Sequence, residues 1–408
     1  MPLFARESSD RSLFSRGPSQ NEGPVVDQGI LIPSLTRNVP RMLVSRMQDH
    51  MVETSNGDIH MVVNLGGDRS IVILTSTDDG DSWSISNRYP DAATNSSSDV
   101  RLIPGEDTML MVYVNENGGI TYNELTYNED NTRWRVTETS EVVASGLDPA
   151  STNPTIAQGG NGALLVAYNI NTDDGVRGVL AGSTNGQNWV LFDELDSEAS
   201  AGSLRAVGTG DGFGVIYVTA EHTYWIEFED GAFTFEEIAD EGAVGIYASH
   251  FTTTTVGEDI FFAGVGEDLA LNFMHYDGAS DTWSEAEVPS GAGVDIGDVS
   301  SVQLSADADG DLFLTYDDYD TGLIHIITSD DEGETWSDVA TLDVPDFLRS
   351  DPARFEAPEH FDGDLVVAYQ FAFPLANGLT GLYYFVVDTE TDTVTTGIAP
   401  EGTDLALL

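Results

Sequence analysis

The chain has 408 residues, of which 40% are hydrophobic and 9% aromatic, so it can bury a large core. It carries 70 acidic residues against 15 basic residues, all of them arginine, and its formal net charge is −55. This charge excludes a basic nucleic-acid-binding surface, and the absence of cysteine excludes disulfides and thiolate metal sites. No apolar run reaches the length of a transmembrane helix, so membrane insertion is not expected.

The acidic residues are expected to coat a folded surface, because the chain is too rich in aromatic and β-branched residues for a disordered protein. Such a surface repels itself at ordinary salt, whereas at molar salt the Debye length falls to about 3 Å and the repulsion is screened. The composition therefore predicts adaptation to near-saturated salt, in a haloarchaeon or a virus of one.

Residues 1–46 differ from the rest of the chain. They carry six arginines and four acidic residues, and they lack the repeat described below. We expect an N-terminal arm that anchors the protein to a partner; the alternative is an arm that folds back on its own domain. The segment has neither the apolar stretch of a secretory signal nor paired arginines, which predicts synthesis in the host cytoplasm without export by these routes.

From residue 47 to residue 400 the chain repeats an apolar strand that follows a tight turn, at intervals of 47 to 55 residues. The seven copies are residues 58–64, 108–114, 163–169, 212–218, 259–265, 311–317 and 364–370. A period near fifty with strand-type residues is typical of a propeller, since one blade cannot bury both of its faces alone. We predict an all-β fold, a seven-bladed β-propeller of four-stranded antiparallel blades over 47–400, followed by a tail at 401–408.

A second repeated pattern, S-x-D-x-G-x-x-W, falls at one phase of the repeat. It is complete twice, and a third copy is one residue shorter. The residues are Ser76, Asp78, Gly80 and Trp83; Ser329, Asp331, Gly333 and Trp336; and Ser183, Asn185, Gly186 and Trp189. We expect each copy to form the hairpin between the third and fourth strands of a blade, with the tryptophan packed between blades and a structural role only.

On these motifs the chain resembles the sialidase and Asp-box (BNR) repeat superfamily of β-propellers. That resemblance implies a propeller fold and, in sialidases, an arginine triad that clamps the substrate carboxylate. The segment Ile30 to Leu35 stands where the first arginine motif would be, and Leu31 occupies the arginine position. The departure predicts that the chain lacks sialidase activity.

Four arginines begin inner strands and would meet at one mouth of the central channel. Together with Tyr247 and His250 they are candidates for binding a carboxylated or sulfated glycan, and they are Arg46, Arg101, Arg205 and Arg354. The alternative is that each arginine pairs with a neighbouring carboxylate. The alternating aspartates of 307–311 favour a strand-to-strand turn over a calcium loop, and no metal site or cofactor is predicted.

Two functions compete, and we predict the first, because no export signal is found and Leu31 argues against a sialidase. The first is a non-enzymatic structural or attachment protein of a haloarchaeal virion (capsid turret, spike or tail module) that faces the high-salt medium and takes a host surface glycan as a candidate ligand. Its partners would be other virion proteins, bound through residues 1–46, and copies of itself in a homo-oligomer. The second is a sialidase-like glycoside hydrolase or lyase that acts in the central funnel.

Overall fold

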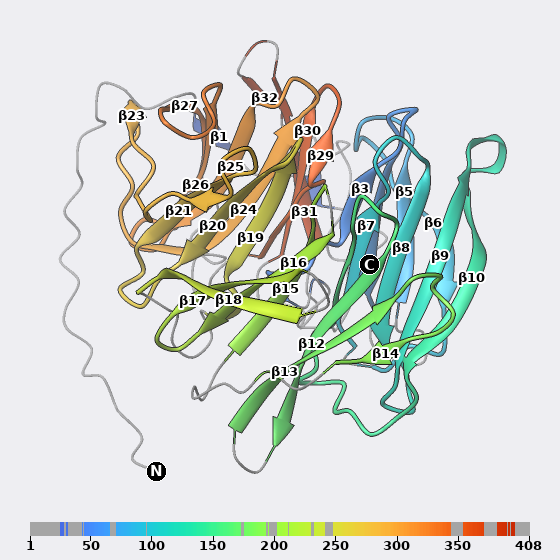
Figure 1. Cartoon of the computed structure of the whole chain (residues 1–408). Helices are drawn as coiled ribbons and strands as arrows, with labels where there is room; N and C mark the ends of the chain where they lie inside the picture. The colour runs from blue at the N-terminus through green and yellow to red at the C-terminus, as the bar shows by residue number, and fades with distance from the viewer. Residues whose placement is uncertain are drawn as a thin grey trace, which may run out of the picture.

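The computed structural model describes residues 25–27, 30–31, 43, 45–65, 71–94, 96–172, 175–192, 195, 202–210, 212–229, 232–240, 248–343, 354–370, 382–389, 391 and 393–395. Apart from short 3-10 turns such as Glu129–Asn131, the regular structure of these residues is β-strand (Figure 1). None of them forms a helix that is long and apolar enough to span a membrane.

In this part of the chain the strands form seven sheets, and the main strands of each sheet are antiparallel neighbours in chain order. The first sheet contains β3 (Met51–Glu53), β4 (Ile59–Asn64), β5 (Ile71–Ser76) and β6 (Ser84–Tyr89). The second contains β7 (Ser98–Leu102), β8 (Thr108–Val114), β9 (Ile120–Asn128) and β10 (Arg133–Val143). The third contains β11 (Thr155–Gln158), β12 (Leu164–Thr172), β13 (Gly175–Ser183) and β14 (Val190–Leu191).

The remaining four sheets repeat this arrangement, and the last two carry additional strands. The fourth contains β15 (Gly202–Gly208), β16 (Phe213–Thr219), β17 (Thr223–Glu229) and β18 (Ala232–Ala239). The fifth contains β19 (Phe251–Val256), β20 (Asp259–Val265), β21 (Leu271–Asp277) and β22 (Thr282–Trp283). The sixth contains β24 (Val299–Asp307), β25 (Leu312–Asp318), β26 (Ile324–Ser329) and β27 (Trp336–Asp343), extended by β1 (Val25–Asp27), β23 (Gly291–Ala292) and β29 (His360–Phe361). The seventh contains β28 (Arg354–Glu356), β30 (Leu365–Gln370) and β31 (Leu382–Asp388), with β2 (Ile30–Leu31) and β32 (Thr393–Thr395) paired to β31.

All seven apolar segments that the sequence singled out are second strands of their sheets, namely β4, β8, β12, β16, β20, β25 and β30. Their continuous apolar character has a simple cause, because both faces of a second strand are covered by neighbouring blades. Every residue of β4 and β30 is buried. An all-β propeller of four-stranded antiparallel blades, as predicted, is therefore the fold of this chain.

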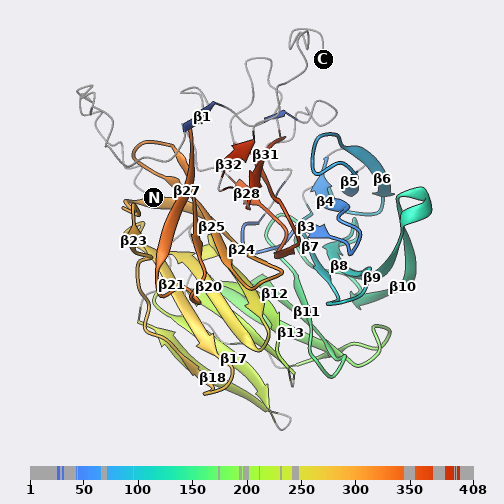
Figure 2. The same ribbon diagram turned by 90° about the horizontal axis from the view of Figure 1, so that it is seen from above.

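Each neighbouring pair of sheets encloses an apolar cluster, and the same holds for the first and last sheets. In the cluster between those two, Met61 and Leu74 pack with Val366 and Tyr384. The core is thus divided among the interfaces between blades, and each blade depends on its neighbours for burial. Seen from above, the outer strands β6, β10 and β18 lie at the rim of the molecule (Figure 2).

The S-x-D-x-G residues form the expected hairpin between third and fourth strands. In the first copy Asp78 Oδ1 accepts hydrogen bonds from Ser76 Oγ at 2.9 Å and from the backbone N–H of Ser82 at 2.8 Å, and Gly80 adopts a φ of 90°. The copy at Ser329 repeats these bonds at 2.8 and 2.8 Å, with a φ of 89° at Gly333. Left-handed backbone at that position requires glycine, which explains the pattern in physical terms.

In the third, shorter copy Asn185 replaces the aspartate. Its side-chain oxygen accepts hydrogen bonds from the backbone N–H groups of Gln187 and Asn188, both at 3.0 Å, and Gly186 supplies a φ of 67°. The hairpin tryptophans reach the preceding blade, as expected. The ring pairs are Trp336 with Phe273 at 5.3 Å, Trp189 with Tyr122 at 5.4 Å, and Trp83 with Tyr384 at 6.3 Å.

Two short segments of the predicted N-terminal arm pair with strands of the propeller. Val25–Asp27 pairs with β27 of the sixth sheet, and Ile30–Leu31 pairs with β31 of the seventh. Leu43 is buried in the cluster between the first and last sheets. These segments pair with the backbone of β27 and β31. The amino-acid composition does not indicate this pairing. Part of residues 1–46 therefore belongs to the propeller, and the anchoring role of the rest stays a prediction.

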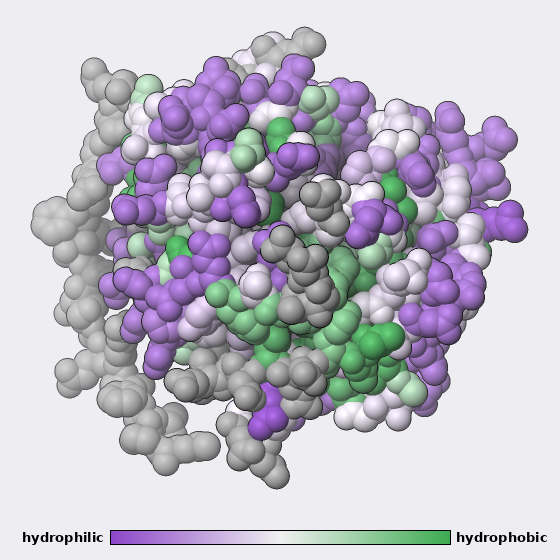
Figure 3. Space-filling model, viewed as in Figure 1, coloured by the Kyte–Doolittle hydropathy of each residue, from purple (hydrophilic) through white to green (hydrophobic). Residues whose placement is uncertain are grey.

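Hydrophilic residues cover most of the face shown in Figure 3, and apolar residues gather in its lower central part, near β12 and β14 in Figure 1. Val190 and Leu191 of β14 are among the exposed large apolar residues. The hydrophilic covering agrees with the acidic composition of the chain.

Candidate functional site

Residues 43 and 45–49 include several that contact residues at or near the starts of inner strands. Their contacts reach several sheets in turn: Leu43 N–H donates to Gln370 Oε1 at 3.0 Å, and Arg354 Nη1 donates to Leu43 O at 2.6 Å. Farther along, Gln48 Nε2 donates to Pro154 O at 2.5 Å and accepts, at Oε1, from Ser97 Oγ at 2.7 Å. We call residues 43 and 45–49 the plug segment, because their contacts join several sheets at this mouth of the channel.

Arg46 holds the plug segment to the fifth and sixth sheets. Its Nε donates to Ser301 Oγ at 3.0 Å, and its Nη1 lies 2.7 Å from His250 Nε2. The other ring nitrogen of His250 lies 2.5 Å from Ser300 O, a partner that can only accept. Burial and the Arg46 charge hold the pKa of His250 well below its ordinary value, so the ring is neutral, donates from Nδ1 and accepts at Nε2.

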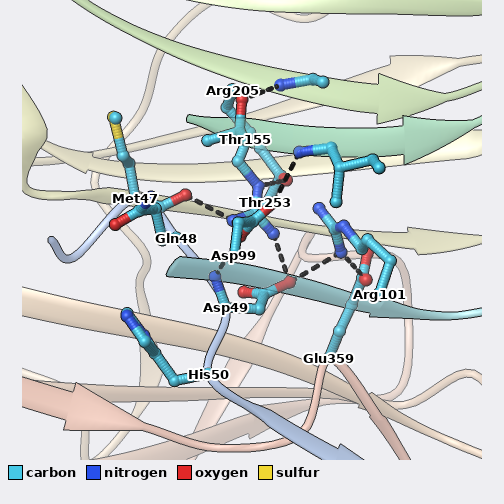
Figure 4. Close-up of polar contacts among 12 residues, drawn as sticks. Met47, Gln48, Asp49, His50, Asp99, Arg101, Thr155, Arg205, Thr253 and Glu359 are labelled. Carbon is cyan, nitrogen blue, oxygen red and sulfur yellow. Dashed lines mark hydrogen bonds and ion pairs between the residues drawn. The ribbon is translucent and has the colours of Figure 1, made fainter. Parts of the chain in front are cut away.

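Asp49 lies at the centre of a buried charge cluster (Figure 4). Its carboxylate bridges two guanidinium groups, those of Arg205 in β15 and Arg101 in β7, and the Arg101 pair measures 2.7 Å. Arg205 is fully buried, and it also donates to Met47 O in the plug segment and to Thr253 Oγ1 at 3.2 Å. Glu359, which precedes β29, pairs with the same nitrogen of Arg101, Nη1. The cluster thus joins residues from widely separated sheets.

Burial and charge act in opposite directions on the carboxylates of this cluster. Burial raises the pKa of Asp49, but Arg101 and Arg205 outweigh it and hold that pKa below its ordinary value. Burial, with the nearby charge of Asp49, raises the pKa of Asp99 to about 6 against the opposing charge of Arg205. Asp99 still accepts backbone hydrogen bonds from Asp49 and Ile156, each at 2.7 Å. Burial lowers the pKa of His50, but the carboxylate of Glu356, 2.7 Å away, reverses this and raises it.

The structure therefore brings together five of the six residues predicted to bind a ligand, but it surrounds them with the chain's own groups. Arg46, Arg101, Arg205, Arg354 and His250 all contact the plug segment, a carboxylate or both. Tyr247 lies outside the described residues, and the side chain of Leu31 does too. A ligand role for the arginines stays a prediction, and their contacts favour the alternative of internal pairing.

The open mouth of the channel lies at the other end, where the inner strands finish. A funnel of about 1030 Å³ is lined there by the turns that follow β3, β7, β19, β24 and β29, and it reaches Asp49, Arg101 and Glu359 at its inner end. An adjoining hollow of about 400 Å³ shares Arg101 and Glu359 and is lined by the turns after β11 and β15. Because first and third strands run in the same direction, the S-x-D-x-G hairpins lie at this end too.

Carboxylates dominate the funnel. They outnumber the one arginine that lines it, Arg101, and they are Asp49, Glu53, Glu106, Asp107, Asp307, Asp309, Glu359 and Asp362. The predicted turn at 307–311 forms part of the wall: Asp307 Oδ1 accepts from the backbone N–H groups of Asp309 and Asp311, each at 2.9 Å. At least partly exposed apolar side chains, those of Leu102, Pro104 and Val256, also line it. The funnel therefore offers hydrogen-bond acceptors on an acidic wall.

Glu53 is a carboxyl group in the funnel whose pKa is raised. Burial raises its pKa to about 8, and the nearby Asp362 and Asp79 act in the same direction, although Asp362 also donates a backbone hydrogen bond to it at 3.1 Å. Glu53 is consequently protonated at neutral pH and can donate a hydrogen bond. No sequence pattern indicated Glu53, because its environment is assembled from the first and last blades.

Glu53 should make the stability of the fold fall as the pH rises. Between the ordinary carboxyl pKa of 4.5 and about 8, folded Glu53 keeps a proton that the unfolded chain releases, so its stabilising contribution is complete below 4.5 and lost as the pH rises through 8. We expect the free energy of unfolding of Glu53→Gln to decline less than that of the wild type over this range in denaturant titrations. Glu141→Gln, an exposed change in β10, is the control. Parallel curves for wild type and Glu53→Gln would contradict the assignment.

No protein-family model matches the chain, and no curated protein does either. Solved structures share the propeller fold at low identity. An arginine-to-alanine triple mutant of AofleA from Arthrobotrys oligospora is 12% identical, with a TM-score of 0.51 over 74% of this chain and 91% of that one. A 6-phosphogluconolactonase candidate from Bacteroides fragilis is 12% identical, with a TM-score of 0.50 over 84% and 94%. A lectin of Aleuria aurantia, described as a six-bladed propeller with a novel fucose recognition mode, is 11% identical, with a TM-score of 0.49 over 73% and 96%. The likenesses to AofleA and to the Bacteroides fragilis protein support the fold described above.

Proposed function

We propose that the chain is a non-enzymatic, glycan-binding propeller whose ligand is a neutral saccharide held in the funnel. The observation that carries the proposal is the funnel itself: a mouth of about 1030 Å³ lined by carboxylate acceptors, one protonated carboxyl at Glu53 and apolar surface. Sugar hydroxyls are donors as well as acceptors, so this mixture of groups suits them. The apolar side chains suit the less polar faces of a sugar ring.

The charge of the funnel changes the class of glycan from the one that the sequence suggested. A carboxylated or sulfated ligand would enter a wall of carboxylates, and like charges repel strongly in a partly desolvated site. The arginines that would attract it are paired with Asp49 and Glu359 or with the plug segment. A neutral ligand avoids this cost.

We further propose that the ring has seven blades. The seven sheets of the described residues and the apolar clusters between them, including the one between the first and last sheets, support this number. The alignment of seven second strands in the sequence is consistent with it.

The biological setting we propose is the attachment or structural module of a haloarchaeal virion, with a host surface glycan as the ligand. The net charge of −55 without lysine supports a high-salt environment. The opposite charge balance of residues 1–46, in the part not paired to β27 or β31, supports contact with an acidic assembly partner. A mass spectrum of purified particles would test this setting.

A glycoside hydrolase or lyase is the second candidate, and Glu53 is the observation that favours it. A carboxyl that stays protonated to about pH 8 has the property of a general acid, and ionised carboxylates share its funnel. We rank it second because sialidase chemistry needs an arginine clamp, whereas the channel arginines are paired internally.

Calorimetric titration in molar KCl tests the proposed function. We expect saturable binding of a neutral oligosaccharide without turnover, and little binding of its sulfated analogue. Asp309→Ala should weaken binding about tenfold, the size of a lost hydrogen bond to a charged group, while Glu141→Gln should not. Release of reducing sugar would support the enzyme instead, and preference for the sulfated ligand would overturn the neutral-glycan proposal.

A further inference from the structure

Outside the funnel, a histidine and two carboxylates meet at the interface between the fifth and sixth blades. Asp259 begins β20, His275 lies in β21, and Glu332 lies in the hairpin between β26 and β27. One potential ligand atom from each residue lies within 4.8 Å of the other two. Two blades therefore contribute to one cluster, which lies beside the interblade contact of Trp336 with Phe273.

The separation of His275 and Asp259 does not suit a hydrogen bond. His275 Nε2 lies 3.7 Å from Asp259 Oδ2, is shielded from solvent, and has no hydrogen-bond partner among the described residues. A hydrogen bond would need about 2.7–3.2 Å. Two ligands of one tetrahedral zinc ion, each about 2.0–2.2 Å from the metal, lie roughly 3.4 Å apart. The observed spacing is close to that of two groups that share an ion.

Both groups of the fifth blade are held in place. The ring of His275 stacks on Phe261, with centroids 4.5 Å apart and an interplanar angle of 17°. Asp259 Oδ1 accepts the backbone N–H of Gly278 at 2.8 Å, which leaves Oδ2 directed at the histidine. Oriented ligands of this kind are typical of metal sites in proteins.

The sixth blade presents Glu332 from a rigid hairpin. Glu332 has a left-handed φ of 60°, and it is fixed between Asp331 and Gly333, whose hydrogen bonds to Thr335 and Ser329 measure 2.8 and 2.9 Å. The matching position of the first hairpin is Asp79, with a φ of 53°. Asp79 belongs to no comparable histidine cluster in the described part of the chain, so it provides a matched control.

We propose that Asp259, His275 and Glu332 bind one divalent transition-metal ion, such as Zn²⁺ or Co²⁺, and so clip the fifth blade to the sixth. An imidazole nitrogen with two carboxylate oxygens is a donor set for these ions, and solvent completes the coordination. The ion also offsets two carboxylates on a strongly acidic surface. Glu332 is distant in the sequence from Asp259 and His275, so no local sequence pattern indicates this site.

Cobalt titration of the full-length, chelator-treated chain in molar KCl tests the proposal. We expect a visible absorption band that saturates at one Co²⁺ per chain and disappears on addition of Zn²⁺. Glu332→Gln, an exposed change that should leave folding intact, is expected to weaken binding at least about tenfold, and His275→Ala more. Asp79→Asn should bind like the wild type.

The melting temperature distinguishes this cluster from a second group of possible metal ligands. His222, Glu237 and Asp240 also lie close together, but all three belong to the fourth blade. Zn²⁺ should raise the melting temperature of the wild type and of His222→Ala, but not that of Glu332→Gln. Binding that survives in Glu332→Gln and His275→Ala, or that is lost in His222→Ala, would overturn the assignment.

Discussion

Replacing Arg205 with methionine is expected to lower the free energy of unfolding by about 3–5 kcal/mol, the usual effect of removing one partner of a buried ion pair. The guanidinium of Arg205 is fully buried and contacts Asp49, Met47 O and Thr253. Without it, Asp49 keeps only Arg101 as a close cationic partner, and the nearby Asp99 repels it more strongly. Denaturant unfolding in molar salt measures the loss.

Two companion variants make this prediction specific. Arg135→Met removes an exposed arginine from β10 and should change stability by less than about 0.5 kcal/mol. Adding Asp49→Asn to Arg205→Met should restore part of the loss, because it removes a buried carboxylate that has lost one of its two cationic partners. A double variant no more stable than Arg205→Met alone would show that the cost comes from packing rather than from charge.

Trp336→Ala should destabilise the fold by about 3–5 kcal/mol, the range for deleting a fully buried tryptophan. Trp336 is 1% exposed, packs edge-on against Phe273 of the preceding blade, and donates from Nε1 to Gly333 O at 3.0 Å. Its removal leaves a cavity between the fifth and sixth blades, where the neighbouring strands are fixed by their own hydrogen bonds and cannot collapse into it.

The matched control is Trp83→Ala in the equivalent hairpin. Trp83 is only partly buried, and its ring centroid is farther from its aromatic partner, Tyr384, at 6.3 Å. We expect a smaller loss, measured by the shift of the denaturation midpoint at constant slope. If both variants lose the same free energy of unfolding, each tryptophan stabilises its hairpin rather than the packing between blades.

Local pattern was sufficient for the strands and hairpins of this protein. The second strands were found because burial on both faces demands a continuous apolar run, and the hairpins because Asp78, Gly80 and Ser76 interact within a few residues of one another. The sequence motif that contains Trp336 recurs at one phase of the repeat, and this recurrence predicted that Trp336 packs between blades.

Only the tertiary structure decided what the channel residues contact. Arg205 and Asp49 are distant in the sequence, and nothing local indicates that the plug segment would contact Arg205. The raised pKa of Glu53 likewise depends on burial by the last blade and on Asp362. The strands of the chain follow from its composition and repeat period, because strand formation depends on residues that are near one another in the sequence. The partner of each buried charge and the open end of the funnel depend instead on how the ring closes.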